Sequence, residues 1–209
     1  MKYRALVWDI DGTLLNTLEG LVAAYQYTIA KLNLPEKTYE EIATFIGPTP
    51  QTIFVSKFGL SEIEAQKAAD IFRDRYKNVD LLKAKPYSDL LSVLEKLSGI
   101  GYKQAVATNK RQDYAVDICR HFGIDKYCRP IYGADNFNKL SKAELIKKCL
   151  NDLEVTNNQA VMIGDTLGDK TAAEQAGVDF IGVNYGFGFK NIEGYANSPS
   201  EILGLLKDE

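Results

Sequence analysis

The feature that most restricts the fold is a set of short apolar runs that each stop abruptly at polar residues. The first covers residues 3–8 and ends at Asp9, and later runs read YKQAVA, AVMI and DFIGV. Runs of this length are typical of strands that are buried on both faces. Amphipathic stretches at residues 90–97, 114–122 and 143–150 separate them. This alternation predicts an α/β fold, a doubly wound parallel sheet with helices on both faces.

Strand signals disappear between residues 18 and 82, directly after the first predicted strand. Helical periodicity takes over at residues 21–32, 39–45 and 62–76, and a turn at Gly47-Pro48-Thr49-Pro50 lies among these stretches. An all-helical block of this size interrupts the α/β pattern, as an inserted domain would. We therefore expect a core domain made of residues 1–16 and 84–209, with an inserted all-helical cap domain at residues 17–83.

Composition argues against several classes of partner. The chain has 209 residues and a net charge of −3, without a basic footprint for nucleic acid. No segment is apolar for long enough to span a bilayer, and the first apolar run is too short for a signal peptide. Cys119, Cys128 and Cys149 are far apart without a CxxC spacing, which argues against disulfides and a zinc site. We expect a cytoplasmic monomer or homodimer with reduced thiols and no nucleic-acid or membrane partner.

Acidic residues follow two of the predicted strands. Asp9 and Asp11 come directly after the first strand, and Asp165 and Asp169 follow the AVMI strand. Ligands of doubly wound sheets bind beyond the carboxyl ends of the strands, so these four carboxylates should meet at one edge. Clustered carboxylates repel one another unless a cation lies between them, and Mg²⁺ prefers oxygen ligands. We therefore predict a Mg²⁺ site, with Gly12 letting the backbone of the turn approach a phosphate group.

Four motifs in order resemble those of the haloacid dehalogenase superfamily. DIDGTLLNT at residues 9–17 resembles its opening DxDGT[LV] signature, ATNK at residues 107–110 its second motif, and GDTLGD at residues 164–169 its fourth. The third motif is a lysine ahead of a helix, for which Lys142 in SKAELI fits best and Lys139 is the rival. Together these motifs span essentially the whole chain. The helical insertion with FIGPTP in its middle and the segment IYGADNF are similar to the phosphoglycolate phosphatase group.

The resemblance implies how these residues would carry out catalysis. Asp9 would attack a phosphorus atom and become an aspartyl phosphate. Asp11 would protonate the leaving oxygen and later take a proton from the attacking water. The residues that would hold the phosphate oxygens are Gly12, Thr108, Asn109 and Lys142.

The same resemblance implies how a metal would be held. The ligands of Mg²⁺ would be Asp9, Asp165 and the backbone carbonyl of Asp11. Asp169 would either hold the water shell of the metal or orient Lys142. Thr49, in the turn of the cap, would face the substrate, because the corresponding stretch of the phosphoglycolate phosphatase group faces the active site.

These roles lead us to expect a Mg²⁺-dependent phosphatase that hydrolyses a small phosphate monoester, phosphoglycolate-like or a sugar phosphate. The cap would exclude bulk water and bind the part of this phosphorylated metabolite that does not react. A phosphomutase would use the same pair of Asp residues but return the phosphate to a sugar. A receiver-like signalling module also accepts phosphate on a strand-end Asp with Mg²⁺, but it is shorter and has no helical insertion. A dehalogenase is disfavoured because it needs no second Asp, whereas this chain has Asp11.

Other conspicuous residues are expected to be structural. Lys110 and Arg111 are interpreted as surface charges at the start of a helix. His121 is the only histidine, and it lies on an amphipathic stretch away from the strand ends, so we expect no catalytic role. Trp8 is expected in the core, and Gly186-Phe187-Gly188 is expected to form a tight loop near the site.

Overall fold

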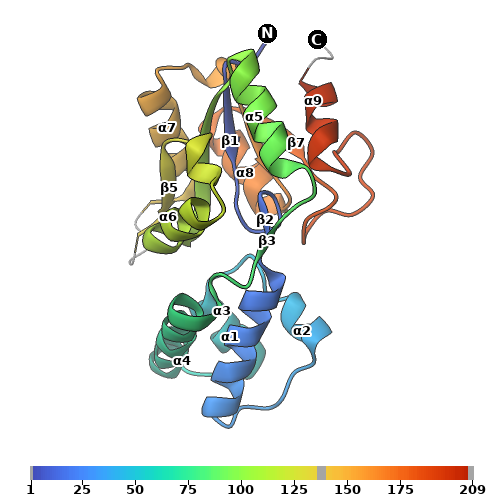
Figure 1. The fold of residues 1–209 in the computed structure, drawn as a ribbon. Helices are drawn as coiled ribbons and strands as arrows, with labels where there is room; N and C mark the ends of the chain where they lie inside the picture. Colours follow the sequence, from blue (N-terminus) through green and yellow to red (C-terminus); the bar gives the residue numbers. More distant parts are fainter. Residues whose placement is uncertain (1, 136–139, 207–209) are drawn as a thin grey trace. The chain divides into compact units, whose positions relative to one another are not determined.

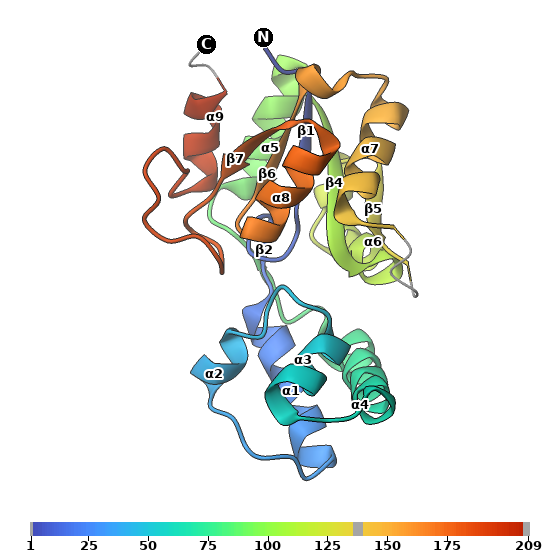
Figure 2. The same cartoon turned by 180° about the vertical axis from the view of Figure 1, so that it is seen from behind.

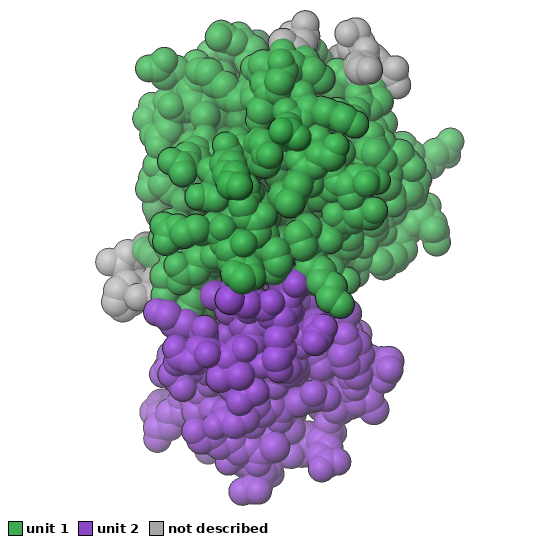
Figure 3. Space-filling view, viewed as in Figure 1, with its two compact units in different colours: residues 1–16, 85–209 green, residues 17–84 purple. Residues whose placement is uncertain are grey.

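The structure, a computed structural model, divides the chain into two compact units. It describes residues 2–135 and 140–206. The core unit consists of residues 1–16 and 85–209, and the helical unit consists of residues 17–84 (Figure 3). Within the described ranges, no helix combines the length and the apolar character that crossing a membrane requires.

The core unit is built on a five-stranded parallel sheet. Its order is β5-β4-β1-β6-β7, with bounds Ile131–Ala134, Lys103–Arg111, Ala5–Trp8, Ala160–Gly164 and Asp179–Gly182. β1 lies at the centre, where Trp8 pairs with Val106 of β4 and with Ile163 of β6. Because all the pairings are parallel, the carboxyl ends of the strands meet at one edge of the sheet.

Helices cover both faces of this sheet (Figures 1 and 2). They are α5 (Leu90–Ile100), α6 (Gln112–His121), α7 (Lys142–Leu153), α8 (Leu167–Ala176) and the short α9 (Ile202–Leu205). Buried side chains of α7 and α8 form one apolar cluster with Val7, Ala105 and Met162 of the sheet. The helices α5 and α6 lie on the opposite face. This arrangement confirms the predicted doubly wound α/β fold, and Trp8 is fully buried as expected.

The sheet differs from the sequence prediction in two places. The strand predicted over residues 102–107 continues to Arg111, because β4 shifts register after Thr108 and pairs again with β5 at Arg111. The strand β5 is not predicted at all. It reads IYGA and is only partly buried, so it lacks the apolar run that marks the other strands.

The helical unit folds around aromatic side chains. Its helices are α1 (Leu18–Lys31), α2 (Tyr39–Ala43), α3 (Pro50–Phe58) and α4 (Glu62–Arg75), followed by a π-helix at Tyr76–Asp80. The ring of Tyr25 has its centroid 5.4, 5.8 and 4.4 Å from those of Phe45, Phe54 and Phe72. The sequence prediction misses α3 because Pro50 marks a turn there. Proline also fits the first helical position, which needs no amide hydrogen.

Both ends of the helical unit join the core unit at one small ladder. The strand β2 (Leu15–Asn16) pairs antiparallel with β3 (Lys85–Pro86), and Asn16 lies opposite Lys85. The chain therefore leaves the core unit and re-enters it at neighbouring positions.

Candidate active site

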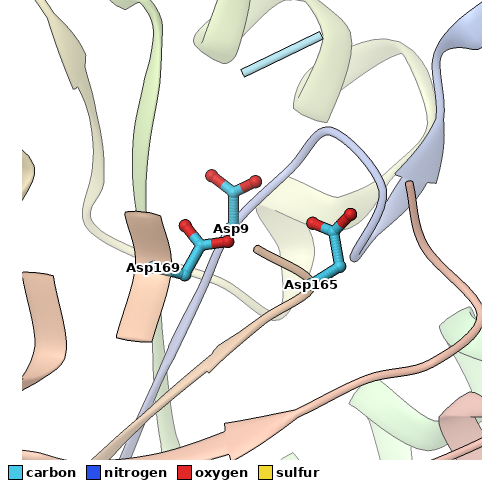
Figure 4. A group of neighbouring side chains, drawn as sticks. All are labelled: Asp9, Asp165 and Asp169. Carbon is cyan, nitrogen blue, oxygen red and sulfur yellow. The ribbon is translucent and has the colours of Figure 1, made fainter. Parts of the chain in front are cut away.

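Asp9, Asp165 and Asp169 are brought together at the carboxyl edge of the sheet (Figure 4). Asp9 directly follows β1 and Asp165 directly follows β6, and these two strands pair with each other. Asp169 lies in the first turn of α8, the helix that leaves β6. The three side chains are buried, and one carboxylate oxygen of each lies within 4.8 Å of the others. The sheet topology alone thus joins acids from distant parts of the sequence.

Lys142 brings a positive charge into this cluster. It is the first residue of α7, which begins at a capping box formed by Ser141 and Glu144. Its buried Nζ donates to Asp9 Oδ1 at 2.5 Å and also to Asp169 Oδ1. Lys139, the rival for this position, lies outside the described residues.

Burial makes Asp9 and Asp165 hold protons more tightly than exposed acids do. Burial raises the pKa of Asp9 to about 7; Lys142 opposes this shift, whereas Asp169 and Asp11 add to it. Burial also raises the pKa of Asp165 to about 6, although hydrogen bonds to its carboxylate oppose the shift. Burial would lower the pKa of Lys142, but Asp169 and Asp9 together outweigh it and raise that pKa. The cluster therefore carries more negative charge than Lys142 balances.

Asp165 is held by groups from two other segments. The backbone N–H groups of Phe187 and Gly188 donate to its Oδ2 at 2.6 and 3.2 Å, and the buried Thr13 hydroxyl donates to its Oδ1 at 3.1 Å. The loop after β7 therefore lies against the site, as expected for Gly186-Phe187-Gly188. Both carboxylate oxygens are engaged, which fixes the orientation of the side chain. The sequence prediction gives these donors no such role, because a backbone amide leaves no mark in a sequence.

Gly12 follows Asp11 in the turn after β1. Its φ of +85° is a left-handed conformation that residues with a side chain rarely adopt. A Cβ atom at this position would lie 2.2 Å from Asp165 Oδ2. Glycine is therefore required here by two independent constraints, and it lets the turn pass directly beside an acid of the cluster.

Asp169 both caps a helix and orients a lysine. Its Oδ2 accepts hydrogen bonds from the Thr166 N–H at 3.0 Å and from the Thr166 hydroxyl at 2.6 Å, which completes a capping box at the start of α8. Its Oδ1 accepts from Lys142. One carboxylate thus links the first turn of α8 to the first residue of α7.

The remaining residues predicted to bind phosphate lie in different surroundings. Thr108 is buried in β4, where its hydroxyl oxygen accepts the Lys110 N–H at 3.2 Å, and Asn109 is exposed. Thr49 belongs to the helical unit, where it accepts the Thr52 N–H as the N-cap of α3. Phosphate binding by Thr108, Asn109 or Thr49 stays a prediction.

Lys110 corrects the expectation of a surface charge. Its side chain is only 3% exposed, and its Nζ lies 2.9 Å from Asp11 Oδ1. Arg111 pairs with Asp113 in a partly exposed ion pair instead. The difference arises because β4 continues to Arg111, so Lys110 lies in a strand, on the same face as the buried Thr108, and not at the start of a helix. The available signal was the position of Lys110 within the ATNK motif. His121, expected either at the surface or in the core, is exposed on α6.

The donor atoms fit a hard divalent cation. Three buried carboxylates offer oxygen atoms within 4.8 Å of one another, and the group contains no Cys or His ligand. Mg²⁺ takes oxygen ligands at about 2.0–2.1 Å and fills its other positions with water or substrate. Lys142 and Lys110 offset two of the four carboxylates contributed by Asp9, Asp11, Asp165 and Asp169. The remaining two carry the charge that one divalent ion balances.

Two curated proteins are similar to this chain over most of its length. A 5'-nucleotidase from Pseudomonas aeruginosa is 33% identical over 207 residues, which cover 99% of this chain and 93% of that protein. A phosphoglycolate phosphatase from Agrobacterium fabrum is 30% identical over 192 residues, which cover 87% of this chain and 80% of that protein. The second similarity confirms the resemblance to the phosphoglycolate phosphatase group.

A solved structure and a family model lead to the same family. The crystal structure of a predicted phosphatase from Clostridium acetobutylicum is 27% identical, covers 100% of both chains and has a TM-score of 0.91. The model of the haloacid dehalogenase-like hydrolases matches residues 6–183, which contain all four motifs. This chain therefore belongs to the haloacid dehalogenase-like hydrolase family.

Proposed function

We propose that the protein is a Mg²⁺-dependent phosphatase that hydrolyses a small phosphate monoester through an aspartyl phosphate on Asp9. The observation that supports this proposal most is the convergence of Asp9, Asp165 and Asp169, two of which, Asp9 and Asp169, pair with the ammonium group of Lys142. A carboxylate repels a phosphate dianion, so an attack by Asp9 needs positive charge beside it. A buried lysine and a set of oxygen donors suited to a divalent cation meet that requirement.

Asp9 acts as the nucleophile in this proposal. One carboxylate oxygen attacks the phosphorus atom, the P–O bond to the leaving group breaks, and the phosphate remains on Asp9 as an acyl phosphate. Lys142 donates to Oδ1 of Asp9, which orients the carboxylate and places a positive charge beside the incoming phosphate. Bound Mg²⁺ would be held by Asp9 and Asp165, and it would supply the positive charge that keeps these acids ionised and offsets the phosphate charge.

Asp11 moves the protons in this proposal. It protonates the oxygen of the leaving group in the first step, and it takes a proton from the water that hydrolyses the acyl phosphate in the second. Its side chain is 20% exposed, whereas that of Asp9 is 8% exposed. The more exposed acid is thus the one that must exchange protons with leaving groups and water.

The helical unit selects the substrate in this proposal. The clustered acids and Lys142 all belong to the core unit, and residues 17–84 contribute none of them. The substrates named for the two similar proteins, phosphoglycolate and 5'-nucleotides, share a phosphate monoester and differ in everything else. The candidate substrates are therefore phosphoglycolate, sugar phosphates and nucleoside 5'-monophosphates.

A panel of phosphate esters tests this proposal. Release of inorganic phosphate is measured with Mg²⁺ for the three candidate classes and for p-nitrophenyl phosphate, on the wild type and on Asp9→Asn. We expect release by the wild type and none by the variant. A wild-type protein that releases no phosphate from any ester contradicts the proposal.

Two other outcomes of the panel point to the competing functions. Isomerisation of a sugar phosphate without net release of phosphate would identify a phosphomutase. A phosphorylated protein that persists for minutes without turnover would identify a receiver-like module.

A further inference from the structure

Lys110 is a second buried lysine beside the clustered acids, and the mechanism above gives it no role. Its side chain is 3% exposed and its Nζ lies 2.9 Å from Asp11 Oδ1. A buried ammonium group is costly unless a counter-charge and hydrogen bonds replace its water. The ion pair with Asp11 provides that counter-charge. Lys110 is thus coupled to the residue that exchanges protons with the substrate.

The backbone around Lys110 is held in place by close contacts with its neighbours. β4 shifts register between Thr108 and Arg111, which places Lys110 in a bulge. The neighbouring strand approaches so closely that a Cβ atom on Gly133 would lie 2.5 Å from the Lys110 carbonyl oxygen. The bulge is held from both sides, because the Thr108 hydroxyl oxygen accepts the Lys110 N–H and the Gln112 Oε1 accepts the Gly133 N–H at 2.7 Å.

The two partners of the ion pair differ in exposure. Lys110 is packed in the interior, whereas the side chain of Asp11 is 20% exposed and lies next to Gly12 in the turn after β1. A side chain in such a position has several accessible rotamers in water. The anchored ammonium group favours the rotamer that directs Oδ1 toward β4. The buried Lys110 therefore restricts the rotamers of the more exposed Asp11 side chain.

We infer that Lys110 is a positioning residue that holds the Asp11 carboxylate where it exchanges protons with the leaving-group oxygen. This inference rests on the proposed phosphatase function. The proton of Asp11 passes to the leaving oxygen as the P–O bond breaks, and Lys110 keeps its own protons throughout. Its contribution is orientation, and it should be largest for esters whose leaving oxygen needs protonation.

The test compares two leaving groups on matched variants. An alkyl phosphate needs a proton on its leaving oxygen, whereas p-nitrophenyl phosphate leaves as a stable anion. We expect Lys110→Met to lower kcat on the alkyl ester by about 10²-fold and on p-nitrophenyl phosphate by less than about 5-fold, with small changes in KM. Lys110→Arg should restore part of the alkyl activity. The control is Lys96→Met, which removes an exposed lysine of α5 and should change neither rate.

A double variant separates positioning from general damage to the fold. In an Asp11→Asn background the buried charge pair is absent, and Lys110→Met should not lower the alkyl-to-aryl rate ratio further. Equal losses on both esters, or a further loss of that ratio in the Asp11→Asn background, would overturn the role of Lys110. A wild type inactive on both esters would instead overturn the proposed function, and the role of Lys110 with it.

Discussion

Asp80 of the helical unit and Asp9 and Asp165 of the core unit are all buried, but their pKa values are shifted in opposite directions. Asp80 in the helical unit is fully buried and lies 2.7 Å from Arg75 Nε and 2.8 Å from Lys83 Nζ. Burial would raise the pKa of Asp80, but the hydrogen bonds and charges of Arg75 and Lys83 outweigh it and lower that pKa. Asp9 and Asp165 in the core unit have raised pKa values of about 7 and 6.

The difference is one of charge balance. In the helical unit Arg75 and Lys83 both pair with one acid, so the negative charge of Asp80 is compensated by neighbouring side chains. In the core unit Lys142 and Lys110 face four carboxylates, so these six groups of the described residues carry more negative than positive charge. A balanced acid supports the fold, whereas an unbalanced cluster stores repulsion that a bound cation can relieve. Burial alone therefore does not separate the two kinds of acid, whereas the local balance of charge does.

The largest expected effect is at Asp9. Asp9→Asn should lower kcat by at least about 10³-fold, because it removes the nucleophile. It also removes one of the mutually repelling charges, so the thermal midpoint in chelator should not fall. Phosphate release gives kcat and thermal unfolding in chelator gives the midpoint, and both are measured on one preparation of the variant. An active variant would show that Asp9 is not the nucleophile. An inactive and unfolded variant would show that Asp9, like Asp80, supports the fold.

Removal of the divalent ion should have the next largest effect. Excess EDTA should reduce phosphate release by at least about 10²-fold, since the surplus charge of the cluster then has no counter-ion. Added Mg²⁺ should restore release and should raise the thermal midpoint of the wild type. Asp165→Asn is the matched control, and its midpoint should respond much less to Mg²⁺. Full turnover in excess EDTA would contradict the metal site.

Asp80 should matter for stability and not for chemistry. Asp80→Asn should lower the free energy of unfolding by about 2 kcal/mol, because charged hydrogen bonds to Arg75 and Lys83 are lost. The kcat for p-nitrophenyl phosphate should stay within about 2-fold of the wild type. The control is Asp70→Asn, which removes an exposed partner of Arg73 and should cost less than about 0.5 kcal/mol. Urea unfolding measures the free energy of unfolding of both variants. Equal losses would show that the buried ion pairs of Asp80 stabilise the fold no more than an exposed pair does.

The pH dependence of stability should distinguish the two kinds of acid. The folded-state pKa values of Asp9 and Asp165 lie above the unfolded value of about 4. The folded chain therefore binds more protons between these values, and stability without metal should fall as pH rises from about 5 to 7. The slope should be on the order of 1 kcal/mol per pH unit. Asp80 has the opposite sign: its contribution is complete at neutral pH and is lost only as pH falls through its lowered pKa.

Urea unfolding at pH 5.5, 6.5 and 7.5 in chelator measures this slope. Asp9→Asn should reduce it, and Asp80→Asn should leave it unchanged over this range. Stability that rises with pH in the chelated wild type would show that the core acids are better compensated than the structure indicates.

The smallest expected effect is at Thr49. Thr49→Ala should cost about 1 kcal/mol of stability because α3 loses its N-cap, and Thr49→Ser should keep the cap. If the helical unit selects substrates, Thr49→Ala should also change the order of kcat/KM among natural esters more than it changes p-nitrophenyl phosphate turnover. Equal losses on every ester would contradict a role in selection.

Residues that depend on strand ends were predictable from the sequence, and residues that depend on irregular backbone were not. Asp9 and Asp165 follow apolar runs, and parallel pairing of β1 with β6 necessarily brings them together. The burial of Lys110 was not predicted because the apolar run of β4 ends at residue 107, whereas the strand continues through an irregular segment to Arg111. The hydrogen bonds from the Phe187 and Gly188 amides to Asp165 were not predicted, because any residue other than proline can supply a backbone donor.

The secondary structure shows the same limit. The strand β5 was missed because it is half-buried and lacks an apolar run. The helix α3 was missed because Pro50 is common both in turns and at the first position of a helix. In both places the local pattern fits two structures, and packing with the rest of the chain decides between them.

The central position of β1 has a consequence for how the protein is made. A ribosome produces residues 5–8 well before their partners in β4 and β6, which begin at residues 103 and 160. The helical unit, residues 17–84, leaves the ribosome before either partner and contains its own aromatic core. The strand β1 therefore cannot pair with β4 and β6 until residues 103–111 and 160–164 have been synthesised. No nascent fragment that ends before Asp169 can contain the complete acid cluster, so the candidate site forms only after both halves of the sheet have been synthesised.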